Sequence, residues 1–246
     1  MPPSVQDAEV TKRPCDMGFN CLALDMSGPG PHDMAWPEPI SLAGARVSVV
    51  PLQFTHQSDL TEAATDGELH KLWYTSVPEP ANISAEIGRR LKLQEAGSML
   101  PFAIVIPASD KMVGQAVGQA VGQAVGQAVG MTTYMNIDAV NRRLEIGSTW
   151  YRKSVQRSGL NTECKYLLLE HAFEVLGCIC VEFRTHFMNQ QSRRAIERLG
   201  AKLDGILRSH MVMPNGTLRD TCVYSIVAAE WPAVKANLRW KMEQGR

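Results

Sequence analysis

The sequence predicts an α/β (α+β) fold in which helices flank a mixed, mostly antiparallel sheet, and three observations lead to that prediction. Three strand-like runs follow one another between residues 100 and 150. Apolar residues at helical spacing occupy residues 162–176. The turn Pro214-Asn215-Gly216 joins two further strand-like runs into a hairpin. Of the 246 residues, 45% are hydrophobic and 20% are charged, which is typical of a folded domain.

The chain is expected to consist of an N-terminal extension over residues 1–42 and one domain over 43–246. The extension is rich in Pro, Gly, Asp and Met and shows no hydrophobic period, so part of it is expected to be disordered. In the domain, Asn82 can cap one helix, Asn161 or Thr162 can cap another, and Trp231-Pro232 begins a C-terminal helix over 231–246. The expected elements are a strand over 46–52, helical pieces over 59–64 and 68–73, a helix over 82–95, strands over 100–107, 131–137 and 143–150, a helix over 162–176, a strand over 178–185, a helix over 192–199, and hairpin strands over 205–213 and 221–228.

A perfect tetrapeptide repeat interrupts the strand-like runs. Val113-Gly114-Gln115-Ala116 occurs four times through Ala128, and a fifth copy starts at Val129. As a helix the repeat would carry a glycine every four residues, and as a strand it would be far longer than its neighbours. The repeat is therefore expected as an insertion over 113–130 that loops out between two strands, as a weakly ordered loop or a marginal helix. A tuning or binding element is the alternative.

Charge, cysteine content and hydropathy exclude several classes of protein. Lys and Arg together number 25, as do Asp and Glu, so the chain lacks the positive charge of a dedicated nucleic-acid binder, and no strongly acidic or basic acceptor groove is indicated. The six cysteines are too scattered for a disulfide framework and show no metal-ligand spacing, so no metal is expected. No secretory signal and no apolar run of about eighteen residues are visible, which argues against a membrane protein and favours a cytoplasmic one.

One strand–loop–helix segment has the features of an anion site. The strand-like run 144–151 leads through a loop that contains Gly159 into the helix over 162–176. Such a loop can direct several backbone N–H groups toward one point, and the helix dipole favours negative charge there. Neither a P-loop nor a G-x-G-x-x-G pattern occurs in this segment. From these residues alone, phosphate binding and a plain turn remain equally open.

Several motifs in order resemble the Gcn5-related N-acetyltransferase (GNAT) family, ribosomal-protein N-terminal acetyltransferase (RimJ/RimL-type) branch. The segment from Gln156 through Gly159 is similar to the family's Q/R-x-x-G-x-G/A motif. Glu145-Ile146-Gly147 and Trp150 resemble the strand that precedes it, and Asn189-Gln190-Gln191-Ser192 resembles the N-x-x-S segment before the closing helix. The resemblance covers residues 43–230.

The resemblance implies acetyl-CoA as co-substrate and assigns roles to individual residues. Backbone groups around Trp150 and Tyr151 would pair with the pantetheine arm, Asn189 would bind near its amides, and Ser192 would return a proton to the departing thiolate. The chain departs from the pattern in having Asn161 at the sixth motif position and no tyrosine in the closing helix. The residues that the resemblance places around the pyrophosphate are Gln156, Arg157, Ser158, Gly159, Leu160, Asn161 and Thr162.

The general base and the acceptor site are less clearly indicated. Candidate bases are Glu145, His210 and Asp220, in that order of preference, although a strand glutamate, a hairpin histidine and a turn aspartate also fit ordinary surface roles. The resemblance also implies that the aromatic-rich loop with His70, Trp73 and Tyr74 forms one wall of the acceptor cleft.

The predicted function is transfer of the acetyl group of acetyl-CoA to a primary amine by direct attack in a ternary complex. The acceptor is either a protein N-terminus or a small amine such as an amino acid, a polyamine or an antibiotic. The alternative is a catalytically weak CoA-binding or CoA-sensing module of the same fold. The oligomeric state stays open, and a homodimer is among the states that the sequence allows.

Overall fold

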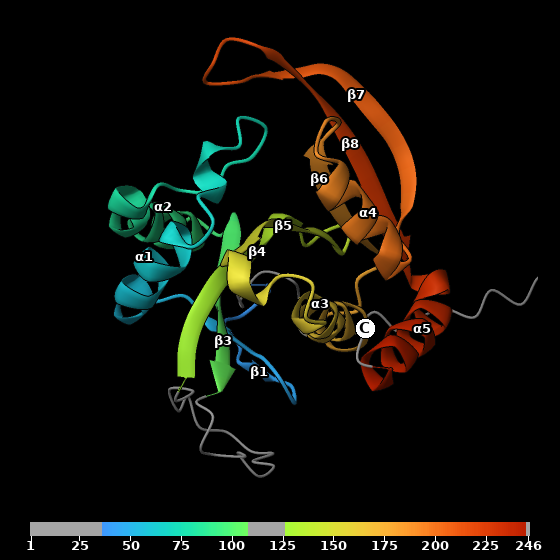
Figure 1. Cartoon of the computed structure of the whole chain (residues 1–246). Helices are drawn as coiled ribbons and strands as arrows, with labels where there is room; N and C mark the ends of the chain where they lie inside the picture. Colours follow the sequence, from blue (N-terminus) through green and yellow to red (C-terminus); the bar gives the residue numbers. More distant parts are fainter. Residues whose placement is uncertain (1–35, 108–125, 245–246) are drawn as a thin grey trace, which may run out of the picture. The chain divides into compact units, whose positions relative to one another are not determined.

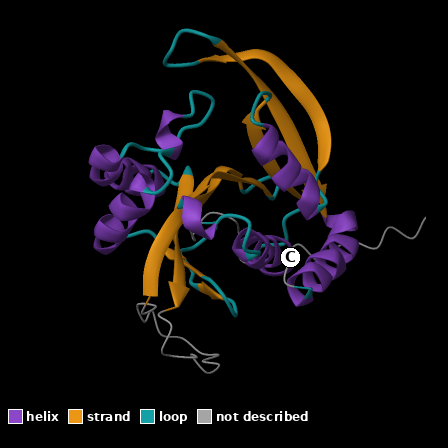
Figure 2. Ribbon diagram, viewed as in Figure 1, coloured by secondary structure: helices purple, strands orange, loops and turns teal. Residues whose placement is uncertain are grey.

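The computed structural model describes residues 36–107 and 126–244, and eight strands in this part form one sheet (Figures 1 and 2). The strand order is β1-β2-β3-β4-β5-β6-β8-β7, and every neighbouring pair is antiparallel except β5 and β6, which are parallel. The predicted mixed, mostly antiparallel sheet is thereby confirmed. The strands are β1 (Leu42–Ala43), β2 (Ser48–Pro51), β3 (Met99–Pro107), β4 (Gly126–Asp138), β5 (Arg143–Tyr151), β6 (Cys180–His186), β7 (Lys202–Val212) and β8 (Leu218–Val227).

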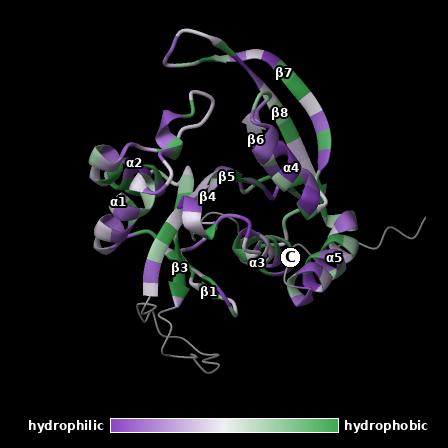
Figure 3. Ribbon diagram, viewed as in Figure 1, coloured by the Kyte–Doolittle hydropathy of each residue, from purple (hydrophilic) through white to green (hydrophobic). Residues whose placement is uncertain are grey.

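Helices cover both faces of the sheet and enclose a separate core on each. On one face, α1 and α2 pack on β3 and β4 through residues such as Leu60 and Ile87. On the other face, α3, α4 and α5 contribute residues such as Leu168, Leu199 and Leu238 to a second, larger core. β3 lies between these layers and is mostly hydrophobic (Figure 3). The helices are α1 (Gln57–Thr65), α2 (Ile83–Glu95), α3 (Leu160–Glu170) with a π-helical continuation (His171–Val175), α4 (Gln190–Leu199) and α5 (Trp231–Glu243).

Short 3-10 turns connect several of these elements, at Phe54–His56, Leu69–Lys71, Pro80–Asn82, Lys153–Val155 and Ala228–Glu230. The helical piece expected over 68–73 is thus reduced to one such turn. Trp36, Ile40 and Leu42 pack against the larger core, so these residues of the expected extension belong to the packed structure. Within the described part of the chain, no helix is long and apolar enough to cross a membrane.

The start of α3 differs from the expected start, and glycine geometry explains the difference. The helix is capped by Gly159, not by Asn161 or Thr162, and Gly159 has a left-handed φ of +79°. That conformation carries little steric cost only for glycine and turns the chain sharply into the helix. Asn161 and Thr162 consequently lie within the first helical turn.

The repeat does not loop out over its whole expected length. Residues 126–130, which end the fourth copy and begin the fifth, form the start of β4, while 113–125 lie outside the described residues. Ala128 and Val129 are fully buried in the centre of the sheet. Gly130 allows β5 to approach, because a Cβ built at this position would lie 2.1 Å from the carbonyl oxygen of Trp150. The prediction of an insertion that reaches residue 130 is therefore wrong for these five residues.

Candidate active site

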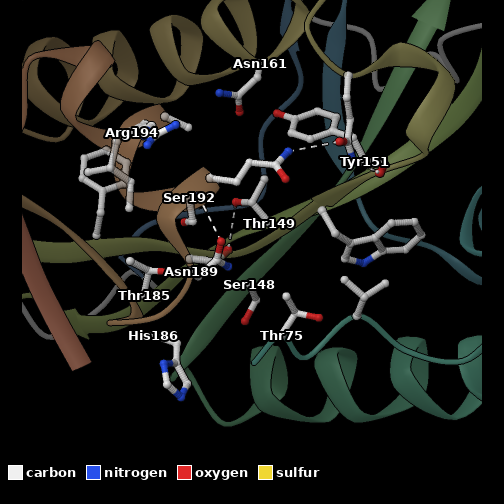
Figure 4. Close-up of a pocket in the computed structure, with 18 of the residues that line it drawn as sticks. Thr75, Ser148, Thr149, Tyr151, Asn161, Thr185, His186, Asn189, Ser192 and Arg194 are labelled. Carbon is white, nitrogen blue, oxygen red and sulfur yellow. Dashed lines mark hydrogen bonds between the residues drawn. The ribbon is translucent and has the colours of Figure 1, made fainter. Parts of the chain in front are cut away.

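The site is built where two neighbouring strands separate. β5 and β6 pair only from Arg143 opposite Cys180 to Glu145 opposite Glu182, and beyond these residues the two strands diverge. A cavity of about 590 Å³ opens there, and its walls come from β5, β6, β8, α3, α4, the loop that precedes α3 and the α1–α2 connection (Figure 4). The volume is within the range of small-molecule sites, which is about 300–1,000 Å³.

A β-bulge turns β5 at the point of separation. Ser148 and Thr149 together oppose the single residue Thr132 of β4, and Ser148 has a left-handed φ of +48°. The extra residue resets the alternation of side chains, so that Thr149 points toward α3 while Trp150 joins the core under α1 and α2. The bulge thereby distributes the last residues of β5 between the two faces of the sheet at the cavity.

Two buried cations hold the bulge from opposite faces of the sheet. Arg90 of α2, which is 1% exposed, donates to the Ser148 carbonyl oxygen at 3.2 Å and pairs with Glu86 at 2.7 Å. Lys165 of α3, which is 5% exposed, donates to the hydroxyl oxygens of Thr132 at 3.1 Å and Thr149 at 2.6 Å. Burial lowers the pKa of Lys165 to about 8, and the amine has no carboxylate partner within the described residues.

The loop before α3 leaves two backbone donors free beside the cavity, which Gly159 and Asn161 line. Arg157 and Gly159 both have left-handed φ angles, +64° and +79°. The amides of Thr162 and Glu163 bond to the Gly159 carbonyl, whereas those of Leu160 and Asn161 donate to no acceptor in the part of the chain that the structure describes. Free N–H groups at a helix N-terminus suit an anion.

Side-chain amides brace the loop, the end of β5 and α4 against one another. The Gln156 amide donates to the Tyr151 carbonyl oxygen at 3.1 Å and accepts from Gln191 at 3.2 Å. Asn189 caps α4, because its Oδ1 accepts from the amide of Ser192 at 3.0 Å. Ser192 is thereby fixed in the first turn of α4, on the wall of the cavity.

All charged side chains among the described residues that line the cavity are cationic. Neither an aspartate nor a glutamate belongs to that lining, although the whole chain is neutral. The balanced composition therefore concealed a basic cavity, contrary to the expectation of no basic groove. No group of His, Cys, Asp and Glu that could hold a metal ion occurs in the described ranges. The cationic lining residues are Arg157, Lys165, Arg184, Arg194, Arg198 and Arg219.

A family model described as an acetyltransferase (GNAT) domain matches residues 46–202. The chain belongs to the GNAT acetyltransferase family. The predicted family is thus confirmed, and the cavity at the separated strands lies within the GNAT match.

Individual relatives agree with this assignment. The chain is 34% identical over 105 residues to YdaF of Bacillus subtilis (strain 168), which bears the name of a ribosomal N-acetyltransferase. The match covers 43% of this chain and 56% of YdaF. A GCN5-related N-acetyltransferase from Brucella melitensis is 28% identical, with a TM-score of 0.69 over 85% of this chain and 91% of its own. Mycobacterium smegmatis RimJ in complex with CoA-disulfide is 20% identical, with a TM-score of 0.65 over 86% of this chain and 97% of its own, and shares the fold.

The structure brings most of the predicted site residues of this GNAT domain to the cavity. Those that line it are Tyr74, Trp150, Tyr151, Gln156, Arg157, Gly159, Asn161, Asn189 and Ser192. Those that do not line it are His70, Trp73, Glu145, Ser158, Leu160, Thr162 and His210. Trp73 nevertheless lies at the edge of the site, where its ring packs against His186 at 5.2 Å.

None of the three candidate bases lines the cavity. Glu145 is 4% exposed and accepts from Asn136 at 2.7 Å, and burial raises the pKa of its carboxyl group. His210 lies exposed on β7 and bonds to Thr221, and Asp220 pairs with Arg208 at 2.6 Å.

Lys165, Arg219 and His186 were missed by the sequence reasoning. Lys165 could have been found, because a lysine within the apolar run of the helix over 162–176 is unusual. His186 and Arg219 lie on ordinary strands, where no local sequence signal marks them.

Proposed function

We propose that this protein transfers the acetyl group of acetyl-CoA to a primary amine, with an α-amino group at a protein N-terminus or on a small molecule as the preferred acceptor. The observation that carries the proposal is the basic cavity between β5 and β6, which reaches the start of α3, where Asn161 lines it and has a free amide. Two comparisons support it: the match to YdaF, and the likeness in fold to a RimJ whose structure holds CoA-disulfide.

The donors on the α3 side of the cavity suit a nucleotide-linked thioester. The amides of Leu160 and Asn161, with the guanidinium of Arg157, would hold the pyrophosphate. Arg194 and Arg198 of α4 would meet a further phosphate. The backbone of Trp150 and Tyr151, beyond the bulge, would pair with the pantetheine amides, and Asn189 would lie near them.

The reaction asks little acid–base chemistry of this lining. Acetyl-CoA supplies the activated carbonyl; the amine nitrogen forms the new C–N bond and loses a proton, the C–S bond breaks, and the thiolate takes up a proton. An α-amino group has a pKa of about 7.7–8.0, so a useful fraction is neutral without a carboxylate base. An α-amino acceptor therefore fits a cavity whose described lining contains no carboxylate. A lysine acceptor, whose pKa is near 10.4, fits it less well. Ser192 would return the proton to the thiolate, and Lys165 would stabilise negative charge that develops near Thr149.

Calorimetric titration with acetyl-CoA and with CoA, followed by thiol release with a panel of amines, tests the proposal. We expect micromolar binding of both ligands and turnover with peptides that carry a free N-terminus. Binding of both ligands without thiol release for any amine would favour the CoA-binding module. Absence of binding would overturn the proposed function.

A further inference from the structure

The cavity has a second wall on the face of the sheet away from α3. Phe183 of β6 packs in the core with α3 and α4, so the alternation along the strand turns Arg184 and His186 to the opposite face. There the α1–α2 connection brings Trp73 edge-on against the His186 ring, with centroids 5.2 Å apart and an interplanar angle of 83°. In the view of Figure 4, His186 and Thr75 are drawn below the cavity, and Asn161 and Arg194 above it.

His186 is a buried hydrogen-bond donor without an acceptor. Its side chain is 4% exposed, and Nδ1 accepts from the amide of Met188 at 3.0 Å. Burial, together with the charge of Arg219, lowers the pKa of His186 and outweighs the opposite effect of Asp220, so the ring is neutral at pH 7. With Nδ1 engaged as an acceptor, the single ring proton belongs to Nε2. This Nε2 atom is buried and has no partner among the described residues.

A fixed Nε2–H makes His186 a donor to a ligand and not a base. A general base at this position would need a free lone pair, and the only lone pair of the neutral ring is taken by Met188. A buried donor in a cavity wall loses its bond to water and gains nothing until a ligand oxygen reaches it. The ligand that completes this wall therefore presents an acceptor atom.

Arg219 lies beside His186 and has unused donors of its own. Thr221 of β8 is the cross-strand partner of His186, and Arg219, two residues away on β8, shares its face of the sheet. The Nε of Arg219 donates to Thr221 Oγ1 at 2.9 Å, and the described part of the chain offers the rest of the guanidinium neither a further hydrogen bond nor an ion pair. Both Arg219 and His186 line the cavity. The charge of the buried Glu145 favours the protonated form of Arg219, but no carboxylate oxygen of the described residues bonds to its terminal N–H groups. Free guanidinium N–H groups next to a neutral N–H donor match a carboxylate better than they match an amide oxygen.

We propose that His186 and Arg219 form a carboxylate-binding subsite for the acceptor, so that the preferred substrate is an amine that also carries a carboxylate. The inference rests on the proposed function, since it takes this wall as the acceptor side. The pyrophosphate donors lie on the other face, at the start of α3, and have cations of their own. The carboxylate can come from an acidic first residue of a peptide or from the α-carboxylate of a free amino acid.

Two matched pairs of acceptors separate these sources, with thiol release as the readout. C-terminally amidated peptides that begin with Asp are compared with the same peptides beginning with Asn, and free alanine is compared with alaninamide. We expect kcat/KM to be at least about tenfold higher for the acid in one of the two pairs, as loss of a charge-assisted hydrogen bond commonly costs that much. The pair that shows the preference identifies the source.

Variants assign the preference to the two residues. Arg219→Met and His186→Phe should each reduce the acid-over-amide ratio toward one and leave the KM for acetyl-CoA unchanged. Arg219→Lys should restore part of the ratio. Arg208→Met is the matched control, because Arg208 lies 80% exposed in the same hairpin and does not line the cavity. Its ratio should equal that of the unmodified protein.

The result that would overturn the subsite is an equal kcat/KM for acid and amide in both pairs. The proposed function would survive that result, since thiol release would still occur. The same four compounds are also titrated into the CoA-saturated protein. If no amine is turned over, the proposed function is removed, but the measured affinities for acid and amide still test the carboxylate subsite. Equal affinities for acid and amide there would contradict the subsite independently.

Discussion

At the scale of single residues, the most consequential side chain is a lysine that no carboxylate of the described residues neutralises. Taking an ammonium group out of water is costly unless other groups compensate, and two threonine hydroxyls compensate Lys165 only in part. Titratable groups in such unfavourable surroundings concentrate at functional sites. Lys165 holds Thr149, which itself bonds to the Gly147 carbonyl, so the charge is tied to the bulge of β5.

Replacing Lys165 by Met should stabilise the free protein at neutral pH and slow acetyl transfer. The pKa of Lys165 in the folded protein, about 8, lies below the usual 10.5. Between these pH values the unfolded chain binds more protons than the folded protein does. The free energy of unfolding of the unmodified protein therefore rises with pH in this range. Below pH 8 burial of the charge costs up to about 3 kcal/mol, and Lys165→Met removes that cost. Thr132 and Thr149 stay paired with each other at 2.8 Å.

Urea unfolding at pH 7 and pH 10 measures this difference. The stability gain of Lys165→Met should be large at pH 7 and should shrink by pH 10, while Lys153→Met, at an exposed position, shows no such change. A stability difference between Lys165→Met and the unmodified protein that is the same at both pH values would contradict the explanation.

At the scale of elements, β4 depends on a close approach that only glycine permits. Gly130 pairs with Tyr151, and any side chain there would collide with the Trp150 carbonyl oxygen on the wall of the site. The approach is therefore relevant both to folding and to the edge of β5 that we assign to the pantetheine arm.

Gly130→Ala should cost about 1–3 kcal/mol of stability, because the strands must move apart to admit the methyl group. Gly205→Ala in β7 is the matched control, since a Cβ there meets nothing within 4 Å, and its effect should stay within about 1 kcal/mol. Thermal unfolding of both variants and calorimetry with CoA provide the comparison. Equal melting temperatures for the two would show that the contact is relieved without cost.

Elements governed by local signals were predictable from the sequence, and those governed by register were not. The hairpin around Asn215-Gly216 and the stop at Gly200, which adopts a φ of +104°, follow from turn and cap chemistry. The bulge at Ser148 depends on which residues of β4 lie opposite, and the sequence of β5 alone does not predict it. The start of α3 was misplaced because Asn161 is a good cap by type, whereas the chain turns at Gly159.

At the scale of the whole domain, function depends on segments that are far apart in the sequence. The cavity combines the α1–α2 connection with β5, α4 and β8, and each contributes a cation or a hydrogen-bond donor that looks ordinary in its own segment. A chain with zero net charge can thus carry a basic cavity, because the acidic side chains of the described residues lie outside its lining. The motif residues around Gly159 could be found by resemblance, whereas Arg219 and His186 required the sheet order.

Deleting residues 113–124, three copies of the repeat, should leave CoA affinity and the melting temperature essentially unchanged. The deletion keeps every residue of β4, and the paired ends Pro107 and Gly126 remain separated by enough chain for a hairpin connection. Calorimetry and thermal unfolding of the shortened protein test this. Loss of folding would assign the deleted copies a structural role.

Residues 126–130 belong both to the tandem repeat and to the beginning of β4, a central strand of the sheet. Because all copies are identical, any whole number of them can be gained or lost before residue 126 and the strand still reads Gly-Gln-Ala-Val-Gly. Inherited length variants of this protein would therefore differ in the connection alone, and Gly130 would face Trp150 in each of them.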